Sequence, residues 1–591
     1  MIAFPDAPLD TTEIVVVDIQ ATGARPEESH VLELGWSRCR AADTSPRGTV
    51  TVKRVMVPAE AEVPSRVLRV TGFRAEELAE GMSPEDAYAS LIDAVRRDSE
   101  GFHPLVAHYA RYETAFLTYF HGKTHPGQPF PFSLCCTHAV AKALFPGLPR
   151  RGLRAVAGYL GFSVPEARRS REHVVATSFI WREVVRRLVR SGVRTFGDLE
   201  EWLAGERSAR VQARREYPMK REERATLPNR PGVYLMLRSD GSLLYVGKAL
   251  SLRRRVASYF GRNRHSDLIL EMLSQARRLR VTVLESVLEA AILECELIKS
   301  LHPPYNQALR AAGRSVIFAG PDLGSFTDHA DEQHPLGPFF QQYPLEVLSW
   351  LISRLAAGRF GQQAFPRLPY QESEGIEGEA EAALEEFSQK HSLRPGCSSL
   401  NPLRLRLLRI GRSVARQRAS IQADSGGGER EGEEELLEQE EADPDRVRPR
   451  VSVAWLESAL VQAAKQFARA AWFVCLRDVL VRWRSSNGGF RMAILVGGRL
   501  VYAGRQAEGD PVPRLQLSTI CRSAQTGKKV ADRSDETSRD WVPDFESCER
   551  LRVLTTELKR LTGQGRELEV WPAAHRRPIR GRRLQVWLEN L

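Results

Sequence analysis

The chain has little that would tie it to a membrane or to an oxidising compartment. It lacks any run of the roughly 18 apolar residues that a membrane span needs. Its longest apolar runs are short, such as Ala470–Leu476. Its N-terminus also lacks a basic stretch followed by an apolar one, which is the pattern of a secretory signal. We therefore expect a cytoplasmic protein with no membrane partner.

The eight cysteines include no Cys-x-x-Cys pair, and their spacing is too scattered for a disulfide framework. Cys135, Cys136 and His138 lie close together in the sequence and could be taken for metal ligands. No second pair of ligands stands at the spacing of a zinc site. We interpret these residues as ordinary buried side chains.

What the chain has is length and positive charge. Its 591 residues predict about three to five domains. Lys and Arg number 85 against 74 Asp and Glu, a formal net charge of +11, and 42% of the residues are hydrophobic. This apolar content excludes a mostly disordered chain. The basic surplus permits binding to nucleic acid but does not require it.

Polar and apolar patterns predict a multidomain α/β protein. Residues 12–190 alternate strand and helix patterns, beginning with the apolar run Ile14–Val17, as is typical of an α/β domain. The remaining segments are a basic, helical connector at 191–227, a small α+β domain at 228–310, a helical region at 321–420, an acidic linker at 421–450 and an α+β module at 451–591. In this last module we expect a helix near Trp455–Ala471 and then a strand at Trp472–Leu476.

The domain at 228–310 contains a hairpin and a basic helix. Its strands are expected at Gly232–Leu237 and Leu243–Val246, and the basic helix at Leu252–Phe260. Gly247 follows the second strand and permits close approach of another part of the chain. Around this corner we expect a cluster of polar side chains, namely Tyr234, Tyr245, Lys248, Arg255 and Tyr259.

Such a cluster suits proton transfer beside a phosphate. Lys248 would lower the pKa of a neighbouring tyrosine, so that Tyr234 or Tyr245 could remove a proton from water. Arg255 could bind a phosphate through two hydrogen bonds and offset charge that develops in the transition state. Each residue alone would more often be structural, so the hypothesis depends on the set.

The helix expected at Val287–Leu301 adds one carboxylate. Glu294 has four apolar helical neighbours, Ala290, Ala291, Leu297 and Ile298. A carboxylate in these surroundings suits a metal ligand. Mg²⁺ (or Mn²⁺) fits, because Mg²⁺ accepts one carboxylate and keeps its waters for a substrate phosphate.

These segments closely resemble the GIY-YIG nuclease domain of excinuclease C and of its shorter homologue Cho. The resemblance rests on Pro231–Tyr234, Tyr245–Ala249, Leu252–Phe260 and Ile292–Asn306, in the expected order. It implies that Tyr245 or Tyr234 is the general base and that Lys248 tunes it. It further implies that Arg255 and Tyr259 bind the scissile phosphate. Glu294 would hold one divalent metal, and Asn306 would order the end of the site.

Residues 12–190 resemble the DnaQ-like (DEDD) 3′–5′ exonucleases. The resemblance lies in Val15–Gly23, Val70–Phe73, Val106–Leu117 and the segment from Ala176 to Leu188. It implies a ribonuclease H-like exonuclease fold. The family's chemistry needs four carboxylates around two metals, together with a histidine base.

The first two motifs keep only part of that set. Asp18 retains the first carboxylate, whereas Gln20 is an amide and supplies no anionic charge. Glu113 replaces the expected aspartate of the second motif and moves its charge by one methylene.

The third motif has two registers. In one, His173 is the base and Ser178 takes the place of the last ligand. In the register that we prefer, His173 replaces the aspartate and Arg168 replaces the histidine. Either register loses the last carboxylate. The resemblance therefore implies a catalytically degenerate domain that binds DNA or a partner.

The leading hypothesis is a metal-dependent DNA endonuclease that makes single-strand incisions in nucleotide-excision-type repair. Its partners would be DNA and other DNA-repair proteins, it would need no small-molecule cofactor, and it would associate with the nucleoid. One alternative is a 3′–5′ DNA exonuclease of the proofreading type. This alternative needs a complete metal site, and residues 12–190 lack some of its expected carboxylates. Another is a noncatalytic DNA-binding scaffold, which would need defects in the domain at 228–310.

Overall fold

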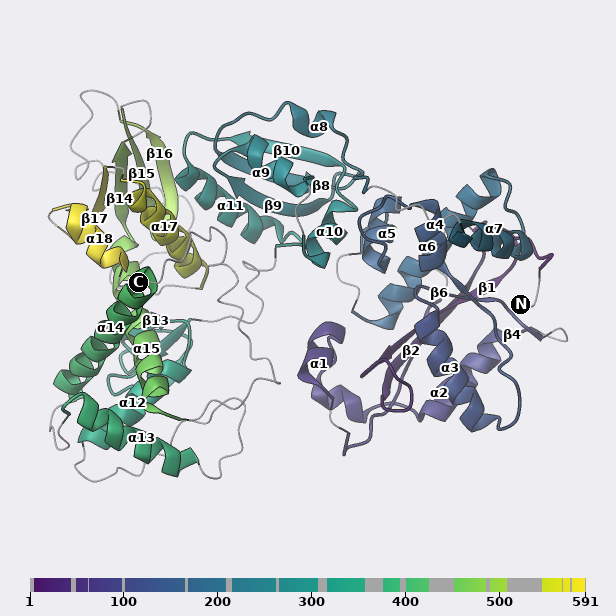
Figure 1. The fold of residues 1–591 in the computed structure, drawn as a ribbon, viewed down its shortest axis with the longest axis horizontal. Coiled ribbons are helices and arrows are strands. Elements are labelled where there is room, and N and C mark those ends of the chain that lie inside the picture. The colour runs from purple at the N-terminus through teal and green to yellow at the C-terminus, as the bar shows by residue number, and fades with distance from the viewer. Residues whose placement is uncertain are drawn as a thin grey trace, which may run out of the picture. The chain divides into compact units, whose positions relative to one another are not determined.

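The computed structural model (Figure 1) describes residues 5–43, 49–61, 63–97, 101–164, 168–208, 215–261, 265–306, 316–356, 376–393, 400–424, 451–484, 489–506, 545–565, 567–573, 575 and 577–589. The chain divides into two compact units. The first comprises Met1–Ser286 and Ser300–Gln307, and the second comprises Val287–Lys299 and Ala308–Leu591. Among the described residues, no helix is long and apolar enough to cross a membrane.

The first unit opens with a five-stranded sheet in the order β3-β2-β1-β6-β7. Its strands are β1 (Ile14–Ala21), β2 (Val31–Cys39), β3 (Thr51–Arg54), β6 (Leu105–Ala107) and β7 (Leu134–Cys136). β1, β2 and β3 pair antiparallel, whereas β6 is parallel to both β1 and β7. This is the topology of a ribonuclease H-like fold, which confirms the predicted fold class.

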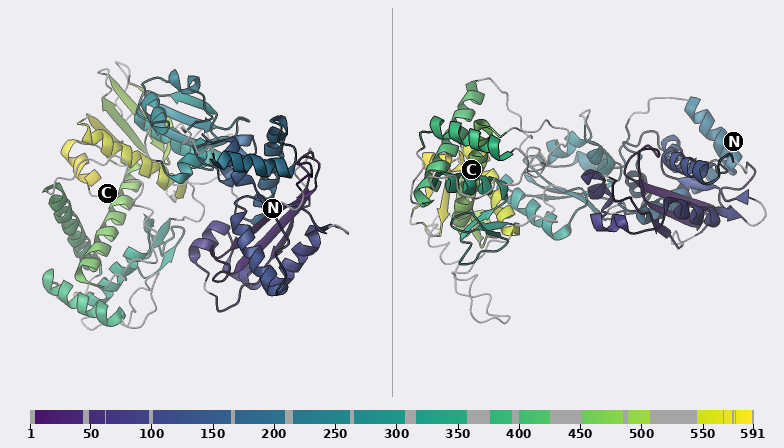
Figure 2. Two further views of the ribbon diagram at one scale, coloured as in Figure 1. Left: turned by 45° about the vertical axis from the view of Figure 1, so that its right-hand side comes forward. Right: turned by 90° about the horizontal axis from the view of Figure 1, so that it is seen from below.

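Helices cover both faces of this sheet. Successive side chains of β1 point to opposite faces, and each face packs in a separate core. Ile14 and Val16 pack with α4 (Thr137–Leu144), α5 (Leu153–Leu160) and α6 (Ser170–Arg190). Val15 and Val17 pack with α2 (Pro84–Val95) and α3 (Arg111–Thr124). Figure 2 shows this layered arrangement from two further directions. The smaller elements are α1 (Ser65–Thr71), η1 (Ala75–Ala79), β4 (Arg96–Arg97) and β5 (Gly101–Phe102).

The predicted connector is helical where it is described, with α7 (Phe196–Ser208) and α8 (Glu222–Ala225). Residues 209–214 lie outside the described residues, and with them two of its arginines. A three-stranded antiparallel sheet follows in the order β10-β8-β9, formed by β8 (Gly232–Leu237), β9 (Leu243–Ala249) and β10 (Arg278–Val283). Its helices are α9 (Leu252–Tyr259) and α10 (Asp267–Leu273). The next helix along the chain is α11 (Val287–Leu301), of which Val287–Lys299 belong to the second unit.

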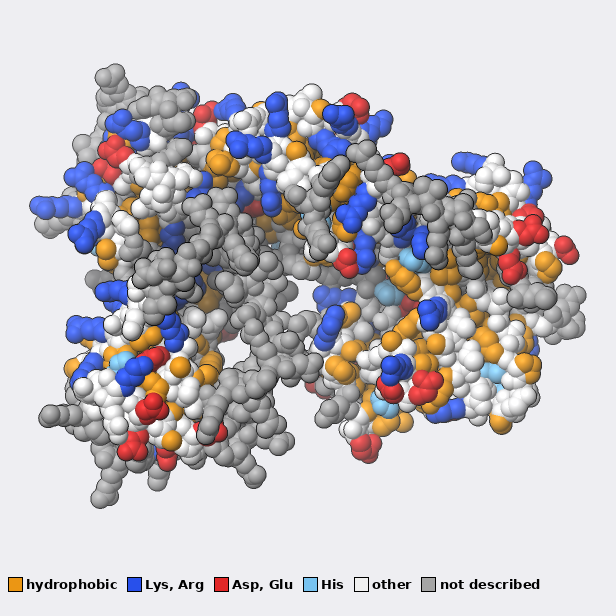
Figure 3. Space-filling view, viewed as in Figure 1, with side chains coloured by type: hydrophobic (Ala, Val, Ile, Leu, Met, Phe, Trp, Pro, Cys, Tyr) orange, Lys and Arg blue, Asp and Glu red, His pale blue; other side chains and the backbone are white. Residues whose placement is uncertain are grey.

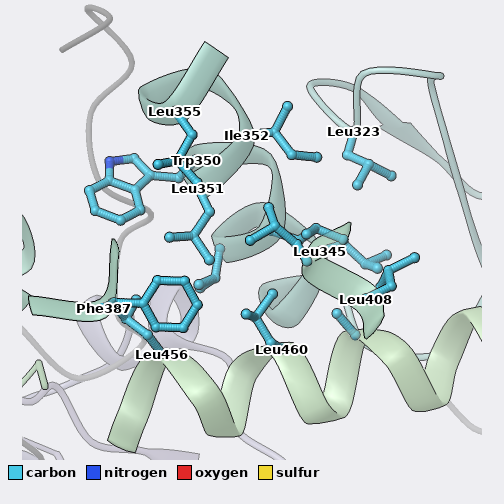
Figure 4. Close-up of a cluster of buried hydrophobic side chains, with 14 of the residues drawn as sticks. Leu323, Leu345, Trp350, Leu351, Ile352, Leu355, Phe387, Leu408, Leu456 and Leu460 are labelled. Carbon is cyan, nitrogen blue, oxygen red and sulfur yellow. The ribbon is translucent and has the colours of Figure 1, made fainter. Parts of the chain in front are cut away.

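The second unit begins with a small sheet and a group of long helices. The sheet contains β11 (Ile317–Ala319), β12 (Phe326–Thr327) and β13 (Leu336–Phe339). The helices are α12 (Tyr343–Ala356), α13 (Ile376–Lys390), α14 (Leu400–Asp424) and α15 (Val453–Leu476). Trp350, Phe387, Leu408 and Leu460 meet in the core between them (Figure 4).

The rest of the second unit is a five-stranded antiparallel sheet in the order β16-β15-β14-β17-β18. The elements are β14 (Val479–Arg484), β15 (Phe490–Val496), β16 (Arg499–Arg505), α17 (Phe545–Gly563), β17 (Leu568–Pro572), β18 (Ile579–Arg580) and α18 (Gly581–Glu589). The α+β character expected for this module is therefore present. Most of the predicted acidic linker, residues 425–450, lies outside the described residues.

The predicted strand at Trp472–Leu476 is wrong, because these residues form the last turns of α15. A short apolar run does not by itself distinguish a strand from a buried helix segment. Trp472, Phe473 and Leu476 are all buried, whereas Val474 between them is 59% exposed. α15 also contributes to two cores, since Leu456 and Leu460 pack with α12–α14 and Trp472 and Phe473 pack with the five-stranded sheet.

Candidate active site

The β8–β9 hairpin brings the predicted tyrosines together. Its register pairs Tyr234 with Gly247 and Met236 with Tyr245. A Cβ atom on Gly247 would collide with the ring and hydroxyl of Tyr234 and would lie 2.8 Å from the Tyr245 ring. Glycine is therefore needed here so that the Tyr234 ring can lie over the backbone of the neighbouring strand.

Burial separates the two candidate bases. Tyr234 is fully buried, and its hydroxyl lies 2.9 Å from the hydroxyl of Tyr259. Burial, followed by the neighbouring Tyr259 and Tyr245, raises the pKa of Tyr234 well above its ordinary value, while Arg255 acts weakly in the opposite direction. Tyr245 is only half-buried, and its ring centroid is 6.1 Å from that of Tyr234. Tyr245 is thus the better placed of the two to meet a water molecule.

Arg255 joins this cluster from α9. Its guanidinium carbon lies 5.2 Å from the centroid of the Tyr259 ring, and it hydrogen-bonds Tyr234. Partial loss of water around the guanidinium lowers the pKa of Arg255, but the electrostatic effects of Tyr234 and Tyr259 are stronger and raise it. The residue as a whole remains exposed, so that a phosphate could reach it. Lys248 lies on β9 opposite Val233 and is half-buried.

The side chain of Asn306 is hydrogen-bonded to β9, the strand that contains Tyr245 and Lys248. Its side-chain oxygen accepts a hydrogen bond from the Val246 N–H (2.9 Å), and its amide nitrogen donates to the Val246 carbonyl (2.7 Å). Asn306 is buried, and the neighbouring Tyr305 N–H donates to the Leu244 carbonyl at 3.1 Å. Asn306 thus connects the end of the domain to the backbone of β9.

Glu294 lies in the part of α11 that belongs to the second unit, and it is half-buried. Among the described residues, no group of three or more His, Cys, Asp or Glu side chains is placed to hold a metal ion together. A metal site built on Glu294 would offer one protein carboxylate, with water and substrate phosphate as further ligands. Mg²⁺ accepts this kind of ligand set.

His265 is a neighbour of the site that the sequence analysis missed. Its ring stacks on that of Tyr259, with centroids 6.0 Å apart and an interplanar angle of 30°. His265 lies after the end of α9, so that the three- and four-residue spacing of a helix does not relate it to the predicted site residues. No sequence pattern therefore indicated it.

In the ribonuclease H-like domain, the carboxylate of Asp18 lies within hydrogen-bond distance of the side chains of Gln20 and His173. The Gln20 amide donates to one oxygen of Asp18 at 2.9 Å, and Nδ1 of His173 lies 2.9 Å from the other. Gln20 and His173 also lie within 3.3 Å of each other. An amide and an imidazole thus surround the one acid that the first motif retains.

The remaining predicted residues of this site differ in their surroundings. Burial, and then the charge of Asp18, raise the pKa of Glu113 well above its ordinary value. Ser178 is buried and donates to the Val174 carbonyl at 2.8 Å, so that it does not fit the role of a last ligand. Arg168 is exposed and packs beside Gly72. This geometry favours the register in which His173 replaces an acid.

The hairpin with its two tyrosines, the basic helix and the asparagine that bonds to β9 define a nuclease domain of the GIY-YIG type. Residues 230–307 match the family model of the UvrC-like GIY-YIG domain. The chain therefore carries a UvrC-like GIY-YIG domain behind a ribonuclease H-like domain.

Two curated relatives are similar to parts of this chain. A protein of Mycobacterium tuberculosis (strain CDC 1551 / Oshkosh) that is named as a bifunctional exonuclease/endonuclease is 29% identical over 309 residues, 51% of this chain and 45% of the relative. UvrABC system protein C of Xanthomonas campestris pv. campestris (strain B100) is 54% identical over 86 residues, 15% of this chain and 14% of the relative. The chain thus spans less than half the length of either relative.

Solved structures give local similarities. The GIY-YIG N-terminal endonuclease domain of UvrC from Thermotoga maritima, bound to magnesium, is 35% identical and covers 15% of this chain and 99% of its own, with a TM-score of 0.14. The nuclease domain of 3′hExo, a DEDDh family member bound to rAMP, is 14% identical and covers 31% of this chain and 95% of its own, with a TM-score of 0.26.

Proposed function

We propose that this protein is a divalent-metal-dependent DNA endonuclease that makes single-strand incisions in nucleotide-excision-type repair. The observation that carries the proposal is the cluster of Tyr234, Tyr245, Tyr259 and Arg255 around Gly247. The names of the UvrABC system relatives support the repair context. The proposal implies a protein of the nucleoid that works beside other DNA-repair proteins and needs no small-molecule cofactor.

The chemistry follows from the side chains that the fold assembles. Tyr245, as its phenolate, accepts a proton from the attacking water, and Lys248 favours that phenolate by its charge. Arg255 binds the scissile phosphate and offsets the negative charge that develops as the water oxygen bonds to phosphorus and the bond to the leaving oxygen breaks. Tyr259 and Tyr234 hold Arg255 through the contacts described above. Glu294 would hold Mg²⁺ or Mn²⁺, which neutralises charge on the phosphate when bound.

Exposed arginines around the hairpin support DNA as the substrate. Arg230, Arg253, Arg254, Arg278 and Arg280 are all exposed. Figure 3 shows Lys and Arg side chains over this part of the molecule, at the upper middle of the view. Positive side chains near the reacting phosphate would also bind the phosphates on either side of it.

For the ribonuclease H-like domain we propose binding of nucleic acid without hydrolysis. Two-metal hydrolysis needs several carboxylates, and here Asp18 is bonded to Gln20 and His173 instead. Tyr109 supports a binding role. It is 50% exposed, has φ = 66°, and stacks on His138 with ring centroids 4.1 Å apart. An exposed, rigidly stacked ring of this kind suits contact with an unpaired base.

A supercoiled plasmid incubated with Mg²⁺ tests the proposal against both alternatives. Nicked circles are the expected product. Shortened linear ends would favour an exonuclease, and a gel shift without cleavage would favour a binding scaffold. Asp18→Ala should leave nicking unchanged. Loss of nicking in that variant would show that the first domain contributes to the chemistry.

A further inference from the structure

α11 is held in the second unit by residues that lie far along the chain. Leu288 and Ile292 are buried in one core with side chains of α15, β14, β15 and α17. Cys295, one turn further on, is 1% exposed. The spacing of these three residues puts them on a single face of the helix. The face is therefore covered by the C-terminal module, residues 451–591.

An ion pair fixes the first turn of this helix. Glu289 pairs with Arg491 of β15, and their side chains are only 9% and 7% exposed. Both side chains are largely shielded from solvent, and removing one partner of a buried ion pair is strongly destabilising.

A second ion pair fixes the last turn. Nζ of Lys299 lies 3.1 Å from a carboxylate oxygen of Glu549 on α17, and the side chains are 8% and 3% exposed. The two pairs are about 15 Å apart along the helix axis. Anchors at both ends oppose rotation of the helix as well as sliding along its axis.

Glu294 lies midway between the two anchors and about a third of a turn away from the covered face. A helix with its side chains has a radius of about 5–6 Å, so that a rotation of about 10° would move its carboxylate by about 1 Å. Displacements of this size are enough to impair catalysis.

We propose that the C-terminal module serves to position Glu294, and that Arg491 and Glu549 are positioning residues for the metal ligand. This inference rests on the proposed function, in which Glu294 holds the metal. It gives the module at residues 451–591 a role in the incision reaction through the position of α11.

The test compares two arginines of the same sheet. Arg491→Met removes the anchor on α11. Arg482→Met is the matched control, because Arg482 pairs with Glu569 of β17 at 3.2 Å instead. In the full-length protein we expect Arg491→Met to raise the Mg²⁺ concentration that gives half-maximal nicking by about 10- to 100-fold. It should also accelerate amide hydrogen exchange in residues 287–299, and Arg491→Lys should restore part of both effects. Arg482→Met should change neither quantity.

Glu294→Gln in the same assays separates the inference from its premise. If Glu294→Gln nicks normally, the metal assignment is wrong. If Glu294→Gln is inactive while Arg491→Met and Arg482→Met have equal Mg²⁺ requirements and equal exchange in 287–299, the positioning inference is wrong. Should Arg491→Met fail to fold, Lys299→Met releases the other end of the helix, and unchanged exchange and Mg²⁺ dependence in that variant would overturn the inference as well.

Discussion

Two tyrosines that sequence reasoning could not tell apart differ sharply in their surroundings. Tyr234 is buried, its hydroxyl is hydrogen-bonded to that of Tyr259, and its pKa is raised. Tyr245 is half-buried on the adjacent strand. Sequence reasoning gave weight to the nearby cation and none to desolvation. At Tyr234 desolvation dominates, and we propose that this residue holds Arg255 rather than removing a proton.

Phenylalanine at each position tests this division. Tyr245→Phe should lower the nicking rate by about 10²–10⁴-fold, the usual contribution of a general base. Tyr234→Phe removes only the hydroxyl that contacts Tyr259 and hydrogen-bonds Arg255, so we expect a smaller loss that appears mainly as weaker binding of DNA. Single-turnover nicking at saturating protein separates the two effects. Equal rate losses in the two variants at saturation would contradict the assignment.

The proposed metal ligand Glu294 gives a second test. Glu294→Gln keeps the shape of the side chain and removes its charge, so that nicking should fall below detection while the protein remains folded. Circular dichroism and thermal melting provide the control for folding. Nicking at the wild-type rate at ordinary Mg²⁺ concentrations would show that another group holds the metal.

At the scale of elements, the hairpin depends on the close approach at Gly247. Gly247→Ala would force its Cβ against the Tyr234 ring, and overpacking of this kind costs about 1–3 kcal/mol. Gly261→Ala is the matched control, because the nearest atom to a Cβ there is 3.7 Å away. Urea denaturation with plasmid nicking should show loss of both stability and activity for Gly247→Ala alone. Equal behaviour of the two variants would contradict the proposed contact.

Most elements of the first unit could be predicted from the sequence, and the physical reason lies in their local patterns. The run Ile14–Val17 and the hairpin expected at Gly232–Leu237 and Leu243–Val246 are each specified by residues close together in the sequence, so that a short window is sufficient. The strand expected at Trp472–Leu476 failed because a short apolar segment fits either secondary structure. The pair Glu289–Arg491 could not be predicted, since 202 residues separate the partners.

At the scale of the whole molecule, positive charge should govern affinity. If the exposed arginines around the hairpin contact phosphates, the logarithm of the DNA-binding constant should fall linearly with the logarithm of the salt concentration, with a slope of about −0.7 to −0.9 per contact. Fluorescence anisotropy of labelled duplexes between low and physiological salt measures this slope. Arg253→Ala should reduce its magnitude by about one contact, and a flat response would argue against DNA as the substrate.

The first unit also joins its two domains by polar contacts. Arg154 of α5 forms an ion pair with Glu271 of α10 at 3.2 Å and lies 5.0 Å from the centroid of the Tyr305 ring. Buried Arg238 donates to Gln275 and to Ser163, which belong to different domains.

Because most of α11 belongs to the second unit, truncation after the UvrC-like domain would separate this helix from its packing partners. A fragment ending near residue 310 contains every residue that the UvrC-like domain match covers. It would nevertheless expose Leu288, Ile292 and Cys295 to water and leave Glu289 and Lys299 without Arg491 and Glu549. Such a fragment is expected to aggregate or to lose the end of its last helix, so the smallest soluble nuclease from this chain should extend to the C-terminal helices.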